Sequence, residues 1–294
     1  MSAPAVAGLT CWPAPAKLNL FLHVTGRRAD GYHELQTLFQ LVDLADELLV
    51  ELRDDGRIER PCGAEGVPAD QDLTVRAARA LQQATGTSLG ATLRLEKRIP
   101  MGGGLGGGSS DAATTLLALN ELWGCGLDIP ALAALGLRLG ADVPVFVRGS
   151  SAWAEGVGER LQPVELPEAW YVIVHPQVHV STAAVFQSPE LTRNSPLITI
   201  RAFFDSGGRN DCEPLVRARF PEVDQALAWL AARAGPAFLT GTGACVFTRC
   251  AGAAEAERLR AQLPDRWRGY VARGLNTSPL HELLKSRAAR LTRL

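Results

Sequence analysis

Two charged residues with apolar neighbours are the first candidates for chemistry in this chain. Lys17 stands in AKLNLFLHV and Asp142 stands in LGADVPVF. Between them, residues 100–110 are PMGGGLGGGSS, with six glycines ahead of two serines. Taken alone, each charged residue has an ordinary explanation, since a lysine can extend along an edge strand and an aspartate can cap the turn before Pro144.

Phosphoryl transfer to an alcohol requires the three parts that these residues supply together. The reaction needs a carboxylate that accepts or orients the hydroxyl proton, a cation near the transferred group and a cradle for the phosphates. Asp142 is the candidate base. Lys17 is the candidate cation, and a nearby cation also keeps a carboxylate ionised. The glycine run is the candidate cradle.

The glycine run has three competing interpretations. A flexible linker is disfavoured because a patterned strand, ATLRLEKRIP, precedes it and a helix, SDAATTLLALNELWG, follows at once. A P-loop requires a lysine directly before the serine, and none precedes Ser109. The spacing Gly102-x-Gly104-x-x-Gly107 matches a dinucleotide fingerprint, but a second helix follows where a parallel strand is needed. A polyphosphate cradle remains, built from bare N–H groups and a helix N-terminus.

The start of that helix contributes hydroxyl groups. We expect Ser109 or Ser110 to cap the helix, with Asp111 in its first turn and Gly124 at its end. The two serine hydroxyls can donate hydrogen bonds to phosphate or bind Mg²⁺.

A second set of residues can bind a flat polar ligand. Tyr32 and His33 follow the Asp-Gly turn of TGRRADGYHEL, so a ring can stack on Tyr32 while His33 binds its polar edge. Phe186 is most simply a core aromatic residue. The glycine turn at residues 241–243 is either a plain hairpin or a further source of N–H donors.

Composition indicates a globular protein that binds a small molecule. Of 294 residues, 47% are hydrophobic and 21% are charged, an ordinary balance for a folded chain. The net charge of -1 gives no bulk attraction to nucleic acid or to an anionic membrane. Residues 1–10 lack the pattern of a signal peptide, and no stretch predicts a membrane span. The six cysteines lack zinc-site spacing, so we expect a cytoplasmic protein with reduced thiols.

Hydrophobic periodicity locates the elements that must position these residues. Residues 16–24 alternate as a strand, which places Lys17 and Asn19 on one face. The segment TLFQLVDLADELLVEL favours strand segments. Helical spacing predicts a helix over residues 70–86.

The remaining elements complete an α+β fold class. IPALAALGLRLG predicts a helix that ends at Gly140, and ADVPVFVRG predicts a short strand. Strands and helices resume after residue 160, which sets a boundary between domains over residues 1–160 and 161–294.

The chain resembles the GHMP kinase superfamily in the segments that carry these residues. PMGGGLGGGSSDAA is similar to the signature Pro-x-x-x-Gly-Leu-Gly-Ser-Ser/Gly-Gly-Ser-Ser. The other matching segments are PAKLNLFLHVTGRRADGYHELQTLFQ, LGADVPVFVRG, AEGVGE and LTGTGACVF. The resemblance extends from about Trp12 to about His281. ADGYHELQT separates, within this superfamily, the kinases whose small-molecule substrate is cytidine diphosphate methylerythritol.

The resemblance implies a two-domain α+β fold, ATP and Mg²⁺ as cofactors, and an active site in the interdomain cleft. It implies that Asp142 is the catalytic base for the 2-hydroxyl group and that Lys17 is its charge partner. The metal ligands stay unassigned. The residues that it implies around ATP are Pro100, Met101, Gly102, Gly103, Gly104, Leu105, Gly106, Gly107, Gly108, Ser109 and Ser110.

The resemblance also implies a substrate-binding set. Tyr32 and Phe186 sandwich the cytosine, His33 binds its edge, Asn19 contacts the methylerythritol part, and Thr182 lies near the substrate. The partner is therefore a small molecule, with no nucleic acid or membrane, and the assembly is a monomer or a homodimer.

Two other functions remain open, and one residue departs from the family. The alternatives are a GHMP-type kinase for homoserine, mevalonate or a sugar, and an inactive nucleotide-binding module, which the presence of Lys17 and Asp142 disfavours. Relatives often carry Asn-Leu where this chain has Asp72-Leu73. A carboxylate cannot donate an amide hydrogen bond, which puts an adenine contact at Asp72 in doubt.

Overall fold

The structure is a computed structural model that describes residues 8–63 and 66–291. Its strands are β1 (Thr10–Arg27), β2 (His33–Arg53), β3 (Ile58–Cys62), β4 (Gly90–Glu96), β5 (Ala152–Gly156), β6 (Arg160–Pro163), β7 (Trp170–His175), β8 (Ala237–Leu239), β9 (Val246–Cys250) and β10 (Arg268–Leu275). Its helices are α1 (Leu73–Thr85), α2 (Gly107–Leu122), α3 (Ile129–Leu137), α4 (Val143–Arg148), α5 (Thr182–Gln187), α6 (Ile200–Ser206), α7 (Glu213–Arg219), α8 (Pro221–Ala234), α9 (Ala253–Arg260) and α10 (Pro279–Leu291).

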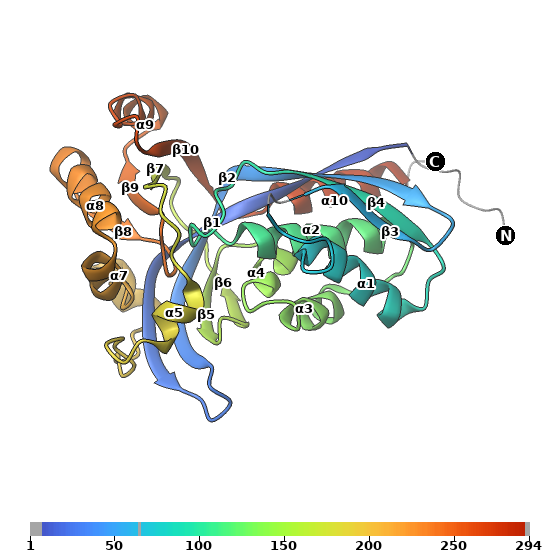
Figure 1. The fold of residues 1–294 in the computed structure, drawn as a ribbon, viewed down its shortest axis with the longest axis horizontal. Coiled ribbons are helices and arrows are strands. Elements are labelled where there is room, and N and C mark those ends of the chain that lie inside the picture. Colours follow the sequence, from blue (N-terminus) through green and yellow to red (C-terminus); the bar gives the residue numbers. More distant parts are fainter. Residues whose placement is uncertain (1–7, 64–65, 292–294) are drawn as a thin grey trace.

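The long hairpin of β1 and β2 runs through the whole molecule (Figure 1). The strands pair antiparallel from Thr10↔Val50 to Arg27↔His33, with register shifts next to Pro15 and Asn19. β2 is one continuous strand, which confirms the strand segments expected there. The main sheet has the strand order β3-β4-β2-β10-β7-β9-β8. Another part of β2 pairs with β5, and β5 pairs in turn with β6. This mixture of sheet and helix confirms the α+β class.

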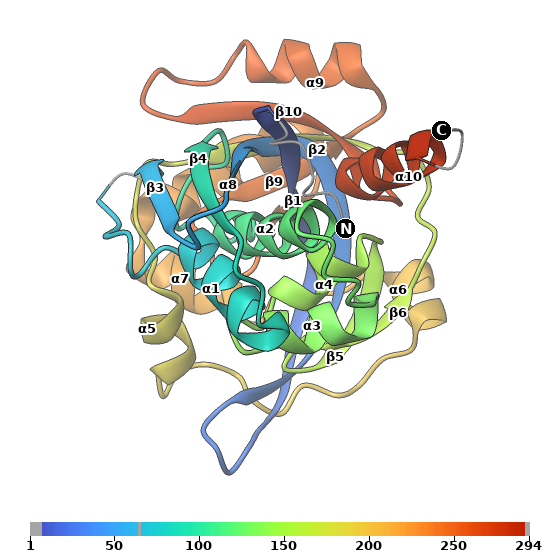
Figure 2. The same ribbon diagram turned by 90° about the vertical axis from the view of Figure 1, so that its right-hand side faces the viewer.

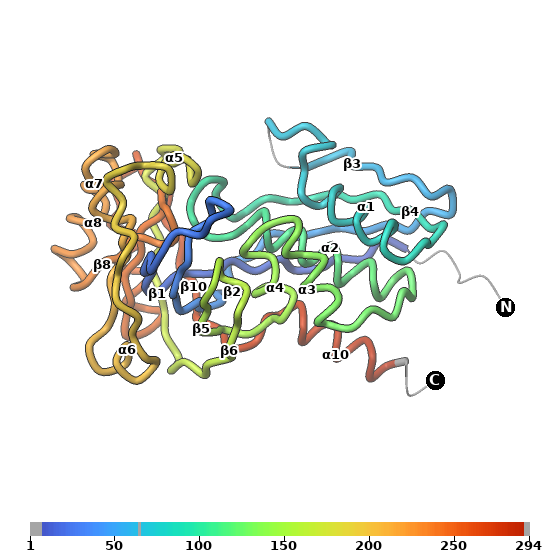
Figure 3. Tube along the Cα trace, turned by 90° about the horizontal axis from the view of Figure 1, so that it is seen from below, coloured from blue at the N-terminus to red at the C-terminus, as the bar shows by residue number. Residues whose placement is uncertain are grey.

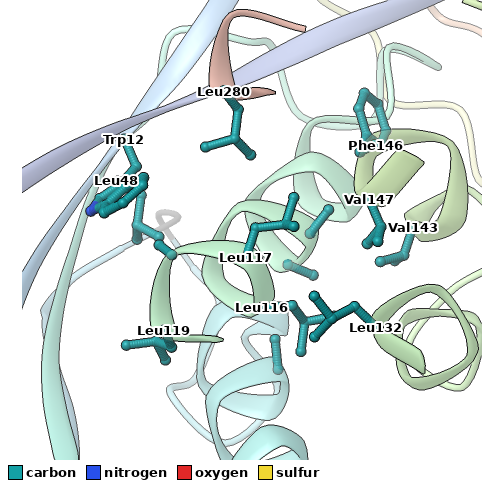
Figure 4. Close-up of a cluster of buried hydrophobic side chains, with 14 of the residues drawn as sticks. Trp12, Leu48, Leu116, Leu117, Leu119, Leu132, Val143, Phe146, Val147 and Leu280 are labelled. Carbon is teal, nitrogen blue, oxygen red and sulfur yellow. The ribbon is translucent and has the colours of Figure 1, made fainter. Parts of the chain in front are cut away.

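Two main hydrophobic clusters lie at opposite ends of this hairpin (Figure 3). In the first, α1–α4 pack against β1, β2 and β4, and the stick view shows Trp12 and Leu48 of the sheet facing leucines of α2 (Figure 4). In the second, α7, α8 and α9 cover β7, β8 and β9. Leu22 and Val24 of β1 belong to this second cluster, so the first strand joins both ends of the molecule.

The last helix also links distant parts of the chain. α10 lies beside β1 (Figure 2), and Leu280 at its start is buried in the same cluster as Trp12. The nitrogen Nε2 of His281 lies 3.0 Å from the carbonyl oxygen of Val147, at the end of α4. Residues from both sides of position 160 therefore pack together in the first cluster.

Two of the helices, α1 and α3, begin at aspartate caps that are visible in the sequence. Asp72 caps α1 and accepts a hydrogen bond from the amide of Thr74, and Gly86 ends that helix with φ of 67°. Asp128 caps α3 in the same way, by accepting from the amide of Ala131. The helices predicted over residues 70–86 and 129–140 are confirmed, with slightly shorter bounds.

Two local predictions are wrong. Residues 141–149 do not form a strand, because Val143–Arg148 form the short helix α4. Its apolar residues are buried on all sides, so they show no period that could separate helix from strand. The serines do not cap α2 either: the helix begins at Gly107, and its N-cap is Gly106 with φ of 74°.

No helix within the described residues is long and apolar enough to cross a membrane.

Candidate active site

A cavity of about 540 Å³ opens at the middle of the β1–β2 hairpin. Its walls come from β1, β2, the start of α1, the loop before α2, the turn before α4, the start of α5 and the glycine turn at residues 241–242. These segments are far apart in the sequence. The cavity therefore collects most of the residues that the sequence singled out, including Lys17, Asp142 and the glycine run.

Lys17 is a buried cation at the centre of the cavity. It lies on β1, and only 2% of it is exposed. Its Nζ donates hydrogen bonds to Oδ1 of Asn19 at 2.5 Å and to the carbonyl oxygen of Gly104 at 2.8 Å. The same nitrogen lies 3.5 Å from Oδ2 of Asp142. A buried charge requires such partners, because leaving it unpaired is costly.

The carboxylate of Asp142 is available to a ligand. Asp142 occupies the N-cap position of α4, but its side chain makes no capping hydrogen bond. Its side chain is 35% exposed, whereas that of Lys17 is 3% exposed. The ordinary explanation for this aspartate, a turn cap, is therefore not what the structure shows. The ion pair leaves one face of the carboxylate open to the cavity.

Asn19 aligns Lys17 from the same face of the strand, which confirms that the two side chains share a face. The Nδ2 group of Asn19 donates to Oγ1 of Thr37 at 3.0 Å, and its backbone amide donates to Oγ1 of Thr240 at 3.0 Å. Sequence analysis did not identify Thr37 or Thr240. Thr37 stands in ADGYHELQT and Thr240 stands in LTGTGACVF, but no periodic pattern distinguishes either threonine.

The glycine loop takes a shape that other residues cannot adopt. Gly104 has φ of 74°, and a Cβ atom there would lie 2.2 Å from the carbonyl oxygen of Thr240. The loop is hydrogen-bonded to the second glycine turn, since the amide of Ala244 donates to Gly102 and that of Cys245 donates to Gly103. The turn at residues 241–243 is thus more than a plain hairpin, because it holds the first loop against the cavity.

The N-terminus of α2 opens into the cavity behind this loop. Gly106, Gly107, Gly108 and Ser109 line the cavity, and the first amides of a helix have no carbonyl partner within it. Such a terminus attracts anions through its N–H groups and its dipole. Ser110 lies behind this surface: it is fully buried, and its hydroxyl has no hydrogen-bond partner in the described part of the chain.

Three charged side chains form a buried cluster beside α2. Lys97 bridges Asp46 and Asp111, and its Nζ donates to Oδ2 of Asp111 at 2.7 Å. Oδ1 of Asp46 also accepts from the backbone amides of Arg98 and Ile99. Burial and the nearby Asp46 raise the pKa of Asp111 to about 7, although Lys97 acts to lower it. No periodic pattern in the sequence indicates this cluster.

The substrate-binding residues named from the resemblance are only partly gathered. Thr182 and Phe186 line the cavity, and the hydroxyl of Thr182 lies 2.9 Å from that of Thr242. Tyr32 and His33 are not among the lining residues, and Tyr32 is 61% exposed. His33 instead stacks on Phe186, with ring centroids 5.1 Å apart.

Asp72 lines the cavity with both carboxylate oxygens engaged. Oδ1 accepts from the amide and hydroxyl of Thr74 at 2.8 and 2.6 Å, and Oδ2 pairs with Arg60 at 2.8 Å. The departure from the family therefore serves helix α1 and its arginine partner.

The donor set of the cavity fits Mg²⁺ that arrives with phosphates. Among the described residues, no three His, Cys, Asp or Glu side chains gather to hold a metal. Mg²⁺ is ordinarily held by one or two carboxylates, with water and substrate phosphates as the other ligands. Asp142 and Ser109 are among the oxygen-bearing residues that line the cavity.

Comparisons with known proteins agree on one family. The family model described as GHMP kinases N terminal domain matches residues 72–150, and the model described as GHMP kinases C terminal matches residues 190–269. A 4-diphosphocytidyl-2-C-methyl-D-erythritol kinase of Pseudomonas paraeruginosa is 58% identical to the chain over 274 residues, covering 93% of this chain and 97% of the relative.

Solved structures give the same grouping. The crystal structure of a 4-(cytidine 5'-diphospho)-2C-methyl-D-erythritol kinase aligns with a TM-score of 0.79 and 37% identity, covering 90% of this chain and 99% of its own. A homoserine kinase from Cytophaga hutchinsonii aligns with a TM-score of 0.69 at 18% identity, covering 95% of this chain and 98% of its own, which shows a shared fold alone.

Proposed function

This chain belongs to the GHMP kinase family, and from that premise we infer that it transfers the γ-phosphoryl group of ATP to an alcohol. The alcohol is the 2-hydroxyl group of 4-diphosphocytidyl-2-C-methyl-D-erythritol, the compound in the printed name of the P. paraeruginosa relative. The reaction is a step of the non-mevalonate route to isoprenoid precursors. The likeness to homoserine kinase supports the fold alone, so another GHMP-type substrate is the weaker alternative.

The observation that carries the chemistry is the pair of Lys17 and Asp142 beside the glycine loop, with 3.5 Å between Nζ and Oδ2. Asp142 accepts the proton of the tertiary 2-hydroxyl group as that oxygen attacks the γ-phosphorus. Lys17 orients the carboxylate, and its position supports a second role in balancing charge on the transferred group. Asn19 holds Lys17 in place from the same strand face.

The ATP phosphates bind along residues 100–110 and at the N-terminus of α2. The glycines leave backbone N–H groups accessible, and the fixed shape of the loop presents them without reorganisation. Mg²⁺ bound with ATP neutralises charge on the β- and γ-phosphate oxygens. Asp142 and Ser109 would hold it from the protein side, because their oxygens line the cavity next to the loop.

The cytidine group binds at the end of the cavity near α5. Tyr32 and Phe186 enclose the cytosine ring, His33 binds its polar edge, and Thr182 lies near the substrate. The position of Thr182 and Phe186 on the cavity wall supports this assignment. Tyr32 stands in an exposed loop, so its contact requires that loop to approach the bound ligand.

Further proposals concern the domains of the enzyme, its location and its assembly. Residues 1–160 and 161–294 are its N-terminal and C-terminal domains, a division supported by the two family models on either side of residue 160. The enzyme acts in the cytoplasm as a monomer or homodimer, with no nucleic acid partner, in keeping with a net charge of -1.

The substrate is tested by measuring ADP release with ATP, Mg²⁺ and one alcohol at a time. We expect turnover with the cytidyl substrate and a kcat/KM at least about 100-fold lower with homoserine, mevalonate or galactose, a margin of roughly 3 kcal/mol. Turnover with one of those alcohols and none with the cytidyl substrate would assign the chain to another branch of the family.

A further inference from the structure

Arg193 lies beside the proposed cytidine site and has no role in the function proposed above. It follows α5, and its guanidinium group donates to the carbonyl oxygens of Phe186 at 2.9 Å and Leu191 at 3.0 Å. A third carbonyl partner is Ser188, at 2.5 Å. The remaining bond runs from Nε of Arg193 to Nε2 of His33, at 3.0 Å.

This bond determines where the imidazole proton lies. Arginine carries five N–H donors and no acceptor, so Nε2 of His33 must offer its lone pair to Arg193. In a neutral ring the proton then resides on Nδ1. A doubly protonated ring would face Arg193 with a second N–H donor, which the geometry disfavours.

The surroundings of His33 keep the ring neutral. Burial lowers the pKa of His33, and the nearby cations Arg193 and Arg27 lower it further. None of the ion pairs in the described part of the chain includes Arg193, whose guanidinium group donates to three backbone carbonyl oxygens. The ring of Phe186 stacks on the other side at 5.1 Å, which leaves Arg27 and Arg193 as the charged groups acting on the ring.

We propose that Arg193 is a positioning residue that fixes His33 as the Nδ1–H tautomer, so that His33 donates a hydrogen bond to an acceptor on the pyrimidine edge of the substrate. The proposal rests on the cytidine-binding role given to His33 above. Cytosine has two such acceptors on one edge, O2 and N3, whereas a ring nitrogen without a proton would repel them. Because Arg193 also bonds to the carbonyl of Phe186, it ties the stacking residue and the edge-binding residue to each other.

The first measurement is the tautomer itself, read from the ¹⁵N shifts of the His33 ring at pH 7.5 in the full-length protein. His33→Gln identifies its signals among the five histidines. We expect the proton on Nδ1 in the unmodified protein. A proton on Nε2 would overturn the proposal without any variant having to fold.

The second measurement compares Arg193→Met with a matched control. Arg193→Met keeps the aliphatic volume and removes the donor to His33. Arg219→Met removes an arginine that binds the same loop at Ser188 and Glu190 but does not touch His33.

For Arg193→Met we expect the Nε2–H tautomer, a KM for the cytidyl substrate about 10-fold higher, and a KM for ATP within about twofold of the starting value, since loss of one hydrogen bond is worth roughly 1 kcal/mol. Arg219→Met is expected to leave the tautomer and both KM values unchanged. A purely structural role would change both KM values together, or neither, with the tautomer unaltered, and would contradict the proposal. Arg193→Lys supplies the second variant if the Met variant does not fold.

Failure of the proposed function gives a different pattern. Suppose that the unmodified enzyme does not use the cytidyl substrate, but that the His33 proton lies on Nδ1 and moves to Nε2 in Arg193→Met. The substrate assignment would then be wrong, whereas the effect of Arg193 on the tautomer would stand. The inhibition constant of cytidine diphosphate then decides the pyrimidine contact: a value unchanged by Arg193→Met would reject it.

Discussion

Lys17 contacts three partners at once although it is almost fully buried. Its ammonium group contacts the carboxylate of Asp142, the amide oxygen of Asn19 and the carbonyl of Gly104. These contacts hold the ammonium group and the carboxylate in one relative orientation. The chemistry of the site therefore depends on one short ion pair whose aspartate remains accessible.

Replacing Asp142 by Asn should remove the base. We expect kcat to fall by roughly 10²–10⁴-fold, the usual effect of losing a positioned acid or base. Steady-state kinetics measure this. Asp54→Asn, which removes an exposed carboxylate away from the cavity, is the control. An unchanged kcat for Asp142→Asn would reject the assignment of the base.

Replacing Tyr32 by Ala tests the proposed stacking on cytosine. Tyr32 is 61% exposed, so the substitution leaves the core intact. We expect KM for the cytidyl substrate to rise about 10-fold, since stacking on an aromatic ring is worth roughly 1–3 kcal/mol per base, and KM for ATP to stay nearly constant. Steady-state kinetics with each substrate varied in turn measure both KM values. Equal effects on both KM values would remove the stacking role.

At the scale of elements, the glycine loop and the glycine turn form one unit. The amides of Ala244 and Cys245, directly after the turn, donate to the carbonyl oxygens of Gly102 and Gly103 and so fix the path of the loop. Thr240 connects this unit to β1, because its hydroxyl accepts from the amide of Asn19 and lies 3.3 Å from the carbonyl of Gly104. The position of Lys17 relative to the glycine loop is thereby set by three elements.

Gly104→Ala should disturb this unit more than any exposed glycine does. The new Cβ atom would lie 2.2 Å from the carbonyl oxygen of Thr240, at a φ of 74° that other residues seldom adopt. We expect the loop to shift, KM for ATP to rise by about 10-fold or more, and stability to fall by roughly 1–3 kcal/mol. Gly252→Ala is the matched control, because nothing lies within 4 Å of its Cβ position. ATP kinetics and urea unfolding identical for both variants would contradict a fixed loop.

Secondary structure was predicted correctly where hydrophobic periodicity and helix-capping residues agree. The prediction was wrong where one of these two signals is missing. Asp72 with Gly86 frames α1, and alternation reveals the inner part of β1. The buried run of α4 has no period, so it was assigned to a strand. The start of α2 was misplaced because a glycine in left-handed conformation ends the loop before the serines are reached.

In the candidate site, unusual residue types identified candidate residues that spacing alone did not identify. A lysine and an aspartate amid apolar residues, and a run of glycines, stand out in any position. Thr240 does not, since its contact with Asn19 joins positions 221 residues apart. The cluster of Asp46, Lys97 and Asp111 was likewise invisible, because its charged residues look ordinary until the fold brings them together.

At the scale of the whole molecule, β1 joins two hydrophobic clusters. Trp12 is buried in one of them and Leu22 and Val24 in the other, while α10 returns the end of the chain to the first. The cavity lies between these clusters, so its geometry depends on both. Changes that weaken one cluster are therefore expected to reach the site through β1.

The pH dependence of stability should reveal the buried cluster of Asp46, Lys97 and Asp111. In the folded state burial and Asp46 raise the pKa of Asp111 to about 7, whereas an unfolded aspartate titrates at roughly 4. Between these values the folded state holds one more proton than the unfolded state. Stability therefore falls as pH rises from about 4 to about 7, by at most about 1.4 kcal/mol per pH unit from this group.

Urea unfolding of the full chain at several pH values measures this dependence. Asp111→Asn carries no titrating proton, so its unfolding midpoint should decline less over this range than that of the unmodified protein. Asp54→Asn, at an exposed position, should follow the unmodified protein. Parallel curves for all three proteins would show that Asp111 does not take up a proton on folding.

The position of the phosphate in the product shows whether the 2-hydroxyl group is the acceptor and Asp142 its base. The enzyme is incubated with ATP, Mg²⁺ and the cytidyl substrate labelled with ¹³C at carbon 2 of the methylerythritol part, and the product is examined by ³¹P and ¹³C NMR. We expect a single new phosphate monoester coupled to carbon 2, formed by the unmodified enzyme and not at a comparable rate by Asp142→Asn. A phosphate on another carbon, or hydrolysis of ATP with no phosphorylated product, would contradict it.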